Sequence, residues 1–209
     1  MSIEGVIRER DIREILHFTT NKGLLGILDS KAIKSRAKLC ENQRLEHILK
    51  LNTPTVKDPA WIDYVNLSIT RINSTLYNIS SNAWHQDDSW WCILSFDPVI
   101  LTHQNVTFAT TNNIFPATLR NQGEAGLNAL FSDPVLGYYS KRVRRPLEMS
   151  ASTPTCEQAE VLYPGEISTD FLQRVYVQTD EEQDDAYGQL AAVFDRNIDV
   201  VVTPEKFTK

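Results

Sequence analysis

The chain has 209 residues, of which 42% are hydrophobic and 23% charged, values typical of a globular protein. We expect residues 1–209 to form a single domain, because this length suffices for one substantial core. The net charge of −6 argues against a generally basic nucleic-acid binder. The apolar stretches are too short for a membrane span and the start lacks a secretory signal, so we expect a cytoplasmic protein without membrane contact.

Helical and strand patterns alternate irregularly along the chain. In the first half, the sequence predicts a strand ending at 17–20, a helix capped by Thr20 or Asn21, a helix over 40–50 and strands over 64–69, 90–96 and 106–109. In the second half, it predicts a helix over 123–136, a strand at 158–162, a short helix over 168–172, a strand at 175–177, a helix over 181–194 and a strand over 198–202. Segments 52–59, 73–89 and 146–155 are expected to be loops. Without regular βαβ alternation, we expect an α+β fold with a mostly antiparallel sheet and flanking helices.

The sequence lacks the motifs of several common kinds of binding and catalytic site. The chain contains no phosphate-binding loop, no Gly-x-Gly-x-x-Gly and no Gly-x-Ser-x-Gly elbow. Cys40, Cys92 and Cys156 are far apart and odd in number, which argues against a zinc site or a disulfide framework. Segment 85–88, His-Gln-Asp-Asp, carries hard metal ligands, but its hydrophilic setting favours a solvated loop. We therefore expect no metal site.

One basic run stands out against the acidic composition. Residues 141–145 place Lys141, Arg142, Arg144 and Arg145 around a single valine. Four cations in five residues are enough for a patch that follows nucleic-acid phosphates. A solvated loop face is an equally good interpretation of this run by itself.

Glu160 lies in the strand-like run Gln158-Ala159-Glu160-Val161-Leu162. A carboxylate in a cleft can hold a sugar hydroxyl and stabilise the cation that forms when a glycosidic bond breaks. A lone Glu in a strand is more often solvated or ion-paired. Other polar candidates at predicted strand ends and in loops are His17, Thr19, Arg36, Arg44, Asn66, Ser68, Arg71 and Asn112. Together these residues can bind a dinucleotide without a glycine-rich loop.

Four blocks of the sequence, in order, resemble the DarT family of DNA ADP-ribosyltransferase toxins. The first is His17 to Leu28 with Ile33-Lys34-Ser35-Arg36 behind it, similar to the family's N-terminal NAD-binding pattern. Residues 63–69 with Arg71 and Leu76-Tyr77 are similar to its central strand and following loop. Residues 108–112 resemble its Phe-Thr-x-x-Asn block, and residues 158–162 resemble its catalytic-glutamate strand.

The resemblance implies an ADP-ribosyltransferase-like fold whose mostly antiparallel sheets form an NAD cleft. It implies NAD as co-substrate, single-stranded DNA as acceptor, an antitoxin that removes ADP-ribose as partner, and a monomer. Glu160 is then the catalytic carboxylate, and Arg44 is the best candidate for an assisting arginine, with Arg71 second. The implied cofactor-binding residues are His17, Thr19, Leu25, Arg36, Tyr64, Asn66, Ser68 and Tyr77, and the implied nucleic-acid-binding residues are Arg71, Lys141, Arg142, Arg144 and Arg145.

The target of the transfer stays open at the level of the sequence. Thymine-modifying members carry an apolar, proline-containing central strand, whereas this chain has Asn66-Leu67-Ser68-Ile69-Thr70-Arg71. The implied target base is therefore guanine or thymine. The alternatives are an ADP-ribosyltransferase acting on RNA or protein, a non-catalytic nucleotide- or nucleic-acid-binding module and, more distantly, a metal-dependent nuclease.

Overall fold

A single mixed sheet organises the chain. The computed structural model describes residues 2–40, 59–83, 89–137, 141–194 and 196–208. Its helices are α1 (Ile3–Glu9), α2 (Asn21–Ser30), α3 (Arg36–Cys40), α5 (Ser74–Ala83), α6 (Gly123–Ala129) and α7 (Asp180–Val193), and short 3₁₀ turns cover Pro59–Trp61, Pro98–Thr102, Thr169–Phe171 and Pro204–Phe207. Its strands are β1 (Ile15–Thr20), β2 (Ala32–Lys34), β3 (Tyr64–Ile69), β4 (Trp91–Phe96), β5 (Thr107–Ala109), β6 (Arg120–Gln122), β7 (Val135–Leu136), β8 (Arg142–Val143), β9 (Glu160–Pro164), β10 (Glu166–Ser168), β11 (Leu172–Val177) and β12 (Asp199–Val202).

Eight strands form the main sheet in the order β12-β11-β4-β1-β3-β9-β5-β6. The β11–β12 pair is parallel, and the other pairs in this sheet are antiparallel. Two small ribbons, β10-β2 and β7-β8, lie outside it. This arrangement confirms the expected α+β fold with a mostly antiparallel sheet.

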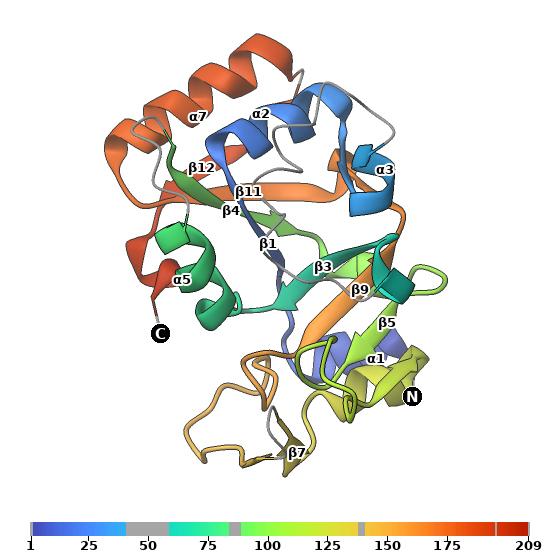
Figure 1. Ribbon diagram of the computed structural model, residues 1–209. Coiled ribbons are helices and arrows are strands. Elements are labelled where there is room, and N and C mark those ends of the chain that lie inside the picture. Colours follow the sequence, from blue (N-terminus) through green and yellow to red (C-terminus); the bar gives the residue numbers. More distant parts are fainter. Residues whose placement is uncertain (1, 41–58, 84–88, 138–140, 195, 209) are drawn as a thin grey trace.

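The sheet divides between β1 and β3. These strands pair only at Ile15 with Ile69 and at Leu16 with Ser68. Beyond that point β1 continues along β4 up to Thr20, while β3 pairs with β9 back to Tyr64. The two halves of the sheet therefore diverge along residues 17–20 of β1, so that β1 and β3 are neighbours at one end only (Figure 1).

Helices cover the sheet in two pairs. Helices α2 and α7 contact each other and the half formed by β1, β4, β11 and β12, while α1 and α6 contact each other beside β5 and β6 (Figure 1). Apolar residues from all four helices join one core cluster. Helix α5 lies on the opposite face, where Tyr77 joins a second cluster with Leu16, Ile93 and Phe207. None of the helices in the described ranges has the length and apolar character that a membrane crossing needs.

The helix ends follow local sequence signals. The Thr20 side chain accepts a hydrogen bond from Gly23 N and so caps α2, as the sequence predicts. Helix α7 begins with a complete capping box between Thr179 and Glu182. The acidic side chains of its first turn interact favourably with the positive end of the helix dipole. The Thr20 cap fixes where α2 leaves the strand that carries His17.

Two sequence predictions are wrong about secondary structure. Segment 73–89 is expected to be a loop, yet Ser74–Ala83 form α5. The helix predicted over 123–136 ends at Ala129, because the chain then turns into β7. The helix predicted over 40–50 falls almost entirely outside the described residues.

Gly126 allows α6 to approach β6 closely. A Cβ atom at Gly126 would lie 2.3 Å from the backbone oxygen of Asn121, so the helix or the strand would have to move. We expect Gly126→Ala to lower the free energy of unfolding by about 1–3 kcal/mol. In contrast, Gly188 of α7 has no atom within 4 Å of such a Cβ, and Gly188→Ala is expected to raise it by ~1 kcal/mol through helix propensity. Urea denaturation measures both changes, and equal midpoints for the two variants would contradict the packing argument.

Candidate active site

Asn66 connects the two halves of the divided sheet. Its backbone carbonyl oxygen lies 3.1 Å from Nδ1 of His17, and its side-chain amide donates a 2.7 Å hydrogen bond to Oε2 of Glu160. A carbonyl oxygen can only accept, so Nδ1 of His17 carries the ring proton in this contact. When the imidazole is neutral, Nε2 is consequently the acceptor nitrogen. One residue of β3 thus orients a histidine of β1 and a carboxylate of β9.

Glu160 is the first residue of β9, and the residue is only 7% exposed. It pairs with Ala109 of β5 on one side. On the other side Leu67 pairs with Val161, so the antiparallel register brings Ser68 opposite Glu160. Because a buried carboxylate needs polar partners, the Asn66 amide both stabilises Glu160 and fixes its direction.

The β pleat separates the candidate residues into two groups. Asn66 and Ser68 share a face of β3 with Glu160, since directly paired residues point the same way. Leu16 pairs with Ser68 and shares that face, so His17 and Thr19 point to the opposite face of β1. The groups come together at the division between the strands, where His17 contacts the Asn66 backbone. A ligand that lies in this division can therefore touch both groups.

The first turn of α2 packs directly on Thr19. A Cβ atom at Gly23 would lie 2.0 Å from the Thr19 hydroxyl oxygen. Only glycine at this position lets the helix start so close to the strand. Leu25, in the same helix, is 41% exposed. Thr19 and the N-terminal half of α2 thus form one wall beside the division of the sheet.

Arg36 and Tyr64 lie at the outer end of β3. Arg36 begins α3, and the next residue, Ala37, donates its backbone N–H to the Ile62 carbonyl at 3.1 Å. The Ser35 hydroxyl donates a 2.9 Å hydrogen bond to Asp63. Tyr64 packs its ring 4.8 Å from that of Trp61. These contacts bring Arg36 close to the start of β3, where the two halves of the sheet are separated.

Tyr77 is part of an aromatic cluster. The residue is 6% exposed, and the centre of its ring lies 5.6 Å from that of Phe18, 5.8 Å from that of Trp91 and 5.7 Å from that of Phe207. Burial raises the pKa of the Tyr77 hydroxyl, which accepts a 3.4 Å hydrogen bond from Gln178. The expected cofactor-binding role of Tyr77 stays a prediction. Arg44 lies outside the described residues, so its role also stays a prediction.

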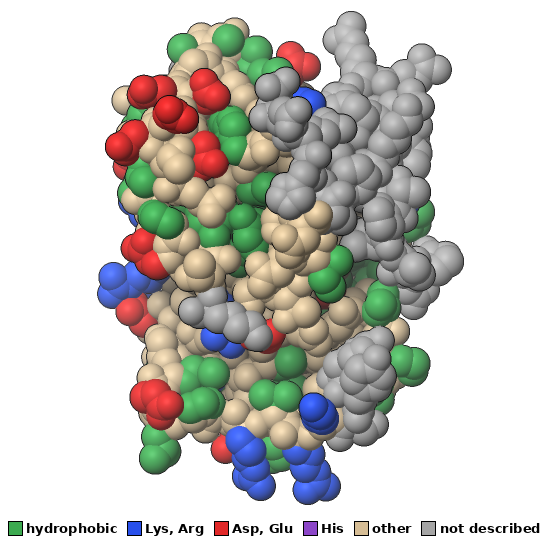
Figure 2. Space-filling model, turned by 60° about the vertical axis from the view of Figure 1, so that its left-hand side comes forward, with side chains coloured by type: hydrophobic (Ala, Val, Ile, Leu, Met, Phe, Trp, Pro, Cys, Tyr) green, Lys and Arg blue, Asp and Glu red, His purple; other side chains and the backbone are tan. Residues whose placement is uncertain are grey.

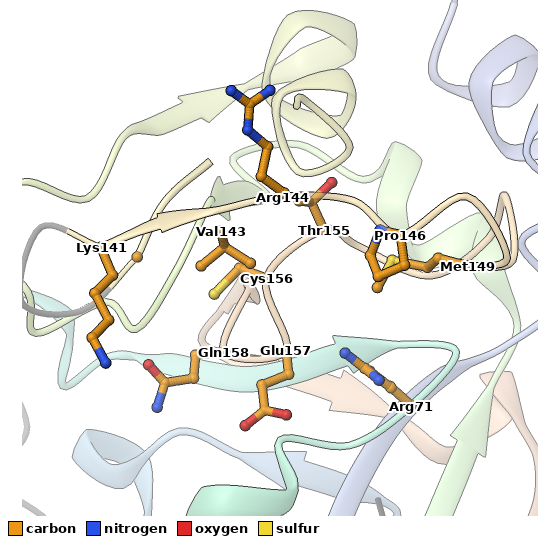
Figure 3. A pocket seen from close by; sticks show the side chains of 11 residues that line it. Arg71, Lys141, Val143, Arg144, Pro146, Met149, Thr155, Cys156, Glu157 and Gln158 are labelled. Carbon is orange, nitrogen blue, oxygen red and sulfur yellow. The ribbon is translucent and has the colours of Figure 1, made fainter. Parts of the chain in front are cut away.

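A groove of about 540 Å³ opens next to the Glu160 strand (Figure 3). It contains Glu157 and Gln158, which directly precede that strand, and Arg71, which follows β3. Thr70, just before Arg71, has a φ of 64°, a strained value for a β-branched residue. In Figure 3, Arg71 and Glu157 lie on one side of the groove, and Pro146 and Met149 lie on the other.

The basic run divides into residues with different environments. Lys141 and Arg144 line the groove, and Arg144 lies 3.9 Å from Asp133 in an exposed ion pair. Arg142 is exposed on β8. Arg145 is half-buried and donates hydrogen bonds to backbone carbonyls of the following loop. Lys and Arg side chains gather at the lower end of the surface in Figure 2, while carboxylates gather at the upper end, where Figure 1 has α7.

Sequence reasoning misses several groove residues. Glu157 and Gln158 have no role in the sequence prediction, although their position just before Glu160 is a signal that points to them. Glu157 accepts a 2.8 Å hydrogen bond from Thr75, which fixes its carboxylate. The described residues include no group of three or more His, Cys, Asp or Glu side chains that could hold a metal ion. Segment 85–88 lies outside those residues.

Comparisons with known proteins match nearly the whole chain. A family model described as "ssDNA thymidine ADP-ribosyltransferase, DarT" matches residues 16–208. The solved structure of Thermus sp. 2.9 DarT in complex with NAD+ is 18% identical with a TM-score of 0.66, over 95% of this chain and 98% of that chain. The same Thermus protein in complex with ADP-ribosylated ssDNA is 16% identical with a TM-score of 0.63, over 95% and 97%. Thermosipho africanus DarTG in complex with ADP-ribose is 17% identical with a TM-score of 0.60, over 93% of this chain and 51% of that chain.

No curated protein matches the chain. The structural similarities, all at low identity, establish a common fold. The family model goes further, because it covers nearly the whole chain, from within β1 to the residue before the last. It confirms the resemblance found in the four sequence blocks. The chain therefore belongs to the DarT family of ssDNA thymidine ADP-ribosyltransferases.

Proposed function

We propose that this chain transfers ADP-ribose from NAD to thymidine in single-stranded DNA and releases nicotinamide. The observation that carries the proposal is the hydrogen bond from Asn66 to Glu160 beside the division of the sheet, next to a groove with basic residues. The family model favours thymine over guanine, the two bases that the sequence leaves open. NAD is a substrate here, and the proposed chemistry needs no metal ion.

Glu160 supports the reaction in two ways. As the bond between the ribose C1′ and nicotinamide breaks, positive charge develops on the ribose, and a carboxylate bound to the 2′-hydroxyl stabilises it. The new bond forms between C1′ and a thymine ring nitrogen. In thymidine that nitrogen is N3, the one that carries a proton, and Glu160 accepts this proton as the bond forms. The Asn66 amide holds the carboxylate in place for both steps.

The division between β1 and β3 is the proposed NAD site. His17 and Thr19 contact the cofactor from one face, and Asn66, Ser68 and Glu160 contact it from the other. Arg36, near the outer end of β3, pairs with the diphosphate, because a guanidinium binds two phosphate oxygens at once. Leu25, Tyr64 and Tyr77 complete the proposed set, and Arg44 stays the candidate for an assisting arginine.

The groove beside Glu160 is the proposed path of the DNA. A base within a duplex must leave its stack before it can reach the ribose, so a single strand is the less costly substrate. Arg71, Lys141 and Arg144 line the groove and can neutralise the phosphates of the DNA. Arg142 is exposed on the neighbouring strand β8. Arg145 instead donates hydrogen bonds to backbone carbonyls of the loop that follows it.

Removing two groove charges should weaken DNA modification selectively. We expect Arg71→Gln combined with Lys141→Gln to raise KM for single-stranded DNA, because two phosphate contacts are lost. The salt slope of log KM should become shallower by about 1.4, because each lost phosphate contact on a single strand contributes roughly 0.7. NAD hydrolysis without DNA should be unchanged. Equal loss of hydrolysis and transfer would indicate damage to the fold rather than to the DNA path.

The direct test offers defined acceptors to the protein together with NAD. Single-stranded DNA oligonucleotides with one thymidine or one guanosine, matched RNA oligonucleotides and duplex DNA are incubated and then weighed by mass spectrometry. We expect one ADP-ribose adduct on the thymidine-containing single strand, with or without a chelator. An adduct on guanosine or on RNA would correct the target, and absence of nicotinamide release with every acceptor would overturn the proposal.

We further propose a partner that removes ADP-ribose from the modified DNA and a monomeric, single-domain, cytoplasmic enzyme. Membership of the DarT family supports the first point, as does similarity to a DarTG protein solved with ADP-ribose. Enzymatic removal of the thymidine adduct by such a partner, followed by mass spectrometry, tests it.

A further inference from the structure

Side chains outside the loop hold the backbone of Pro146–Thr155. Arg145 donates from Nη1 to the Thr153 carbonyl at 2.6 Å and from Nη2 to the Ser150 carbonyl. The Thr70 hydroxyl donates to the carbonyl between them, that of Ser152, at 3.0 Å. Three carbonyl groups within four residues thus accept hydrogen bonds from two side chains that approach from different elements.

The Arg145 guanidinium is itself fixed by its surroundings. It lies 5.9 Å from the centre of the Phe131 ring, and Arg10 lies 4.1 Å from the same ring. The Arg145 backbone N–H donates to Asp133 at 3.3 Å. At the far end of the loop, Thr155 donates its N–H to the Leu130 carbonyl at 2.9 Å. Both ends of the loop are therefore attached to the segment that follows α6.

The loop held in this way forms one side of the groove. Pro146, Met149 and Thr155 line it, facing the side that carries Arg71 and Glu157 (Figure 3). We propose that Arg145 is a positioning residue for the acceptor: its guanidinium fixes the loop so that the groove has the shape that places a nucleotide beside Glu160. This inference rests on the proposed transfer to single-stranded DNA.

The geometry distinguishes this role from phosphate binding. A planar guanidinium donates in a fixed fork, which suits two carbonyls held apart by the backbone, whereas an ammonium group is a point charge. Thr153 is only 8% exposed, so its carbonyl has little water to replace a lost donor. Lysine at this position would keep the charge but could not donate to both carbonyls in the geometry of the guanidinium. A residue that only neutralises a DNA phosphate, in contrast, keeps its charge and its part of the salt slope when arginine is replaced by lysine.

The test compares Arg145→Lys with Arg145→Gln. We expect both to raise KM for single-stranded DNA about tenfold, since an unfixed loop must be ordered on binding. The salt slope of log KM should stay that of the wild type, and NAD hydrolysis without DNA should be unchanged. Thr70→Val, which removes the hydroxyl and keeps the branched side chain, should cause a smaller increase in the same direction. Arg13→Lys, at an exposed arginine paired with Asp11, serves as the control.

Hydrogen exchange of peptides from residues 146–155 gives a readout that needs no DNA. Exchange in this loop should be faster in Arg145→Lys and Arg145→Gln than in the wild type, with the rest of the chain unchanged. A wild-type KM for Arg145→Lys, or a shallower salt slope for Arg145→Gln, would overturn the proposal in favour of phosphate binding. A wild-type protein that modifies no DNA would instead overturn the proposed function, and unchanged loop exchange would independently exclude the positioning role.

Discussion

Glu160→Gln should abolish most of the activity. We expect the rate of ADP-ribose transfer to DNA to fall by about 10²–10³-fold, because the amide neither balances the charge on the ribose nor accepts the base proton. NAD hydrolysis without DNA should fall as well, since nicotinamide release needs the first of these effects. The change keeps the size of the side chain, so the thermal unfolding midpoint should stay near that of the wild type. Nicotinamide release and adduct mass measure both rates.

A matched control distinguishes the effect of losing the Glu160 carboxylate from the effect of losing any carboxylate. Glu181→Gln removes an exposed carboxylate at the start of α7 and should keep wild-type rates. Wild-type labelling by Glu160→Gln would refute the catalytic assignment. If hydrolysis alone survived in that variant, Glu160 would act on the acceptor base and not on the ribose.

Asn66→Ala should produce the second largest effect. The substitution removes the 2.7 Å hydrogen bond that directs the Glu160 carboxylate, while the backbone contact to His17 can remain. A small displacement of a catalytic group is costly, so we expect transfer to fall by about 10–10²-fold, less than for the loss of Glu160 itself. Asn78→Ala, at an exposed position of α5, is the control and should be neutral. Single-turnover labelling of a thymidine-containing oligonucleotide measures the change.

Asn66→Asp should change how the transfer rate depends on pH. The substitution sets a second carboxylate at hydrogen-bonding distance from the first, and two such groups ionise fully only at higher pH. Transfer needs an ionised Glu160, so the acid limb of the pH–rate profile should move to higher pH and activity should recover as the pH rises. A profile of wild-type shape with uniformly lower rates would show that Asn66 does not act through the carboxylate.

Local signals in the sequence are sufficient for much of the fold. Thr20 predicts the start of α2, and Thr179 with Glu182 marks the start of α7. Helix α5 is missed because its residues, rich in Asn and Ser, have weak helix propensity. It forms because the Asn73 side chain accepts a hydrogen bond from Leu76 N at 3.0 Å and because Tyr77 packs among the rings of Phe18, Trp91 and Phe207, which are distant in sequence. Only the first of these causes is visible in sequence.

The candidate site depends more on contacts that are distant in sequence. The blocks around His17, Asn66 and Glu160 can be named from sequence, but the division between β1 and β3 and the opposite faces of the two groups follow from strand register. Arg145 illustrates the limit most clearly. In sequence it is one of four neighbouring cations, and only the folded loop distinguishes it from Arg142 and Arg144 by giving its guanidinium two carbonyl partners.

The separation of charge between α7 and the groove has a consequence for how the enzyme meets DNA. On the face shown in Figure 2, carboxylates gather at the α7 end and Lys and Arg side chains at the groove end, on a protein with a net charge of −6. We expect a polyanion to be repelled at the α7 end and attracted at the groove end, which favours encounters that bring the strand to the groove. We expect the negative net charge also to weaken non-specific adhesion to duplex DNA.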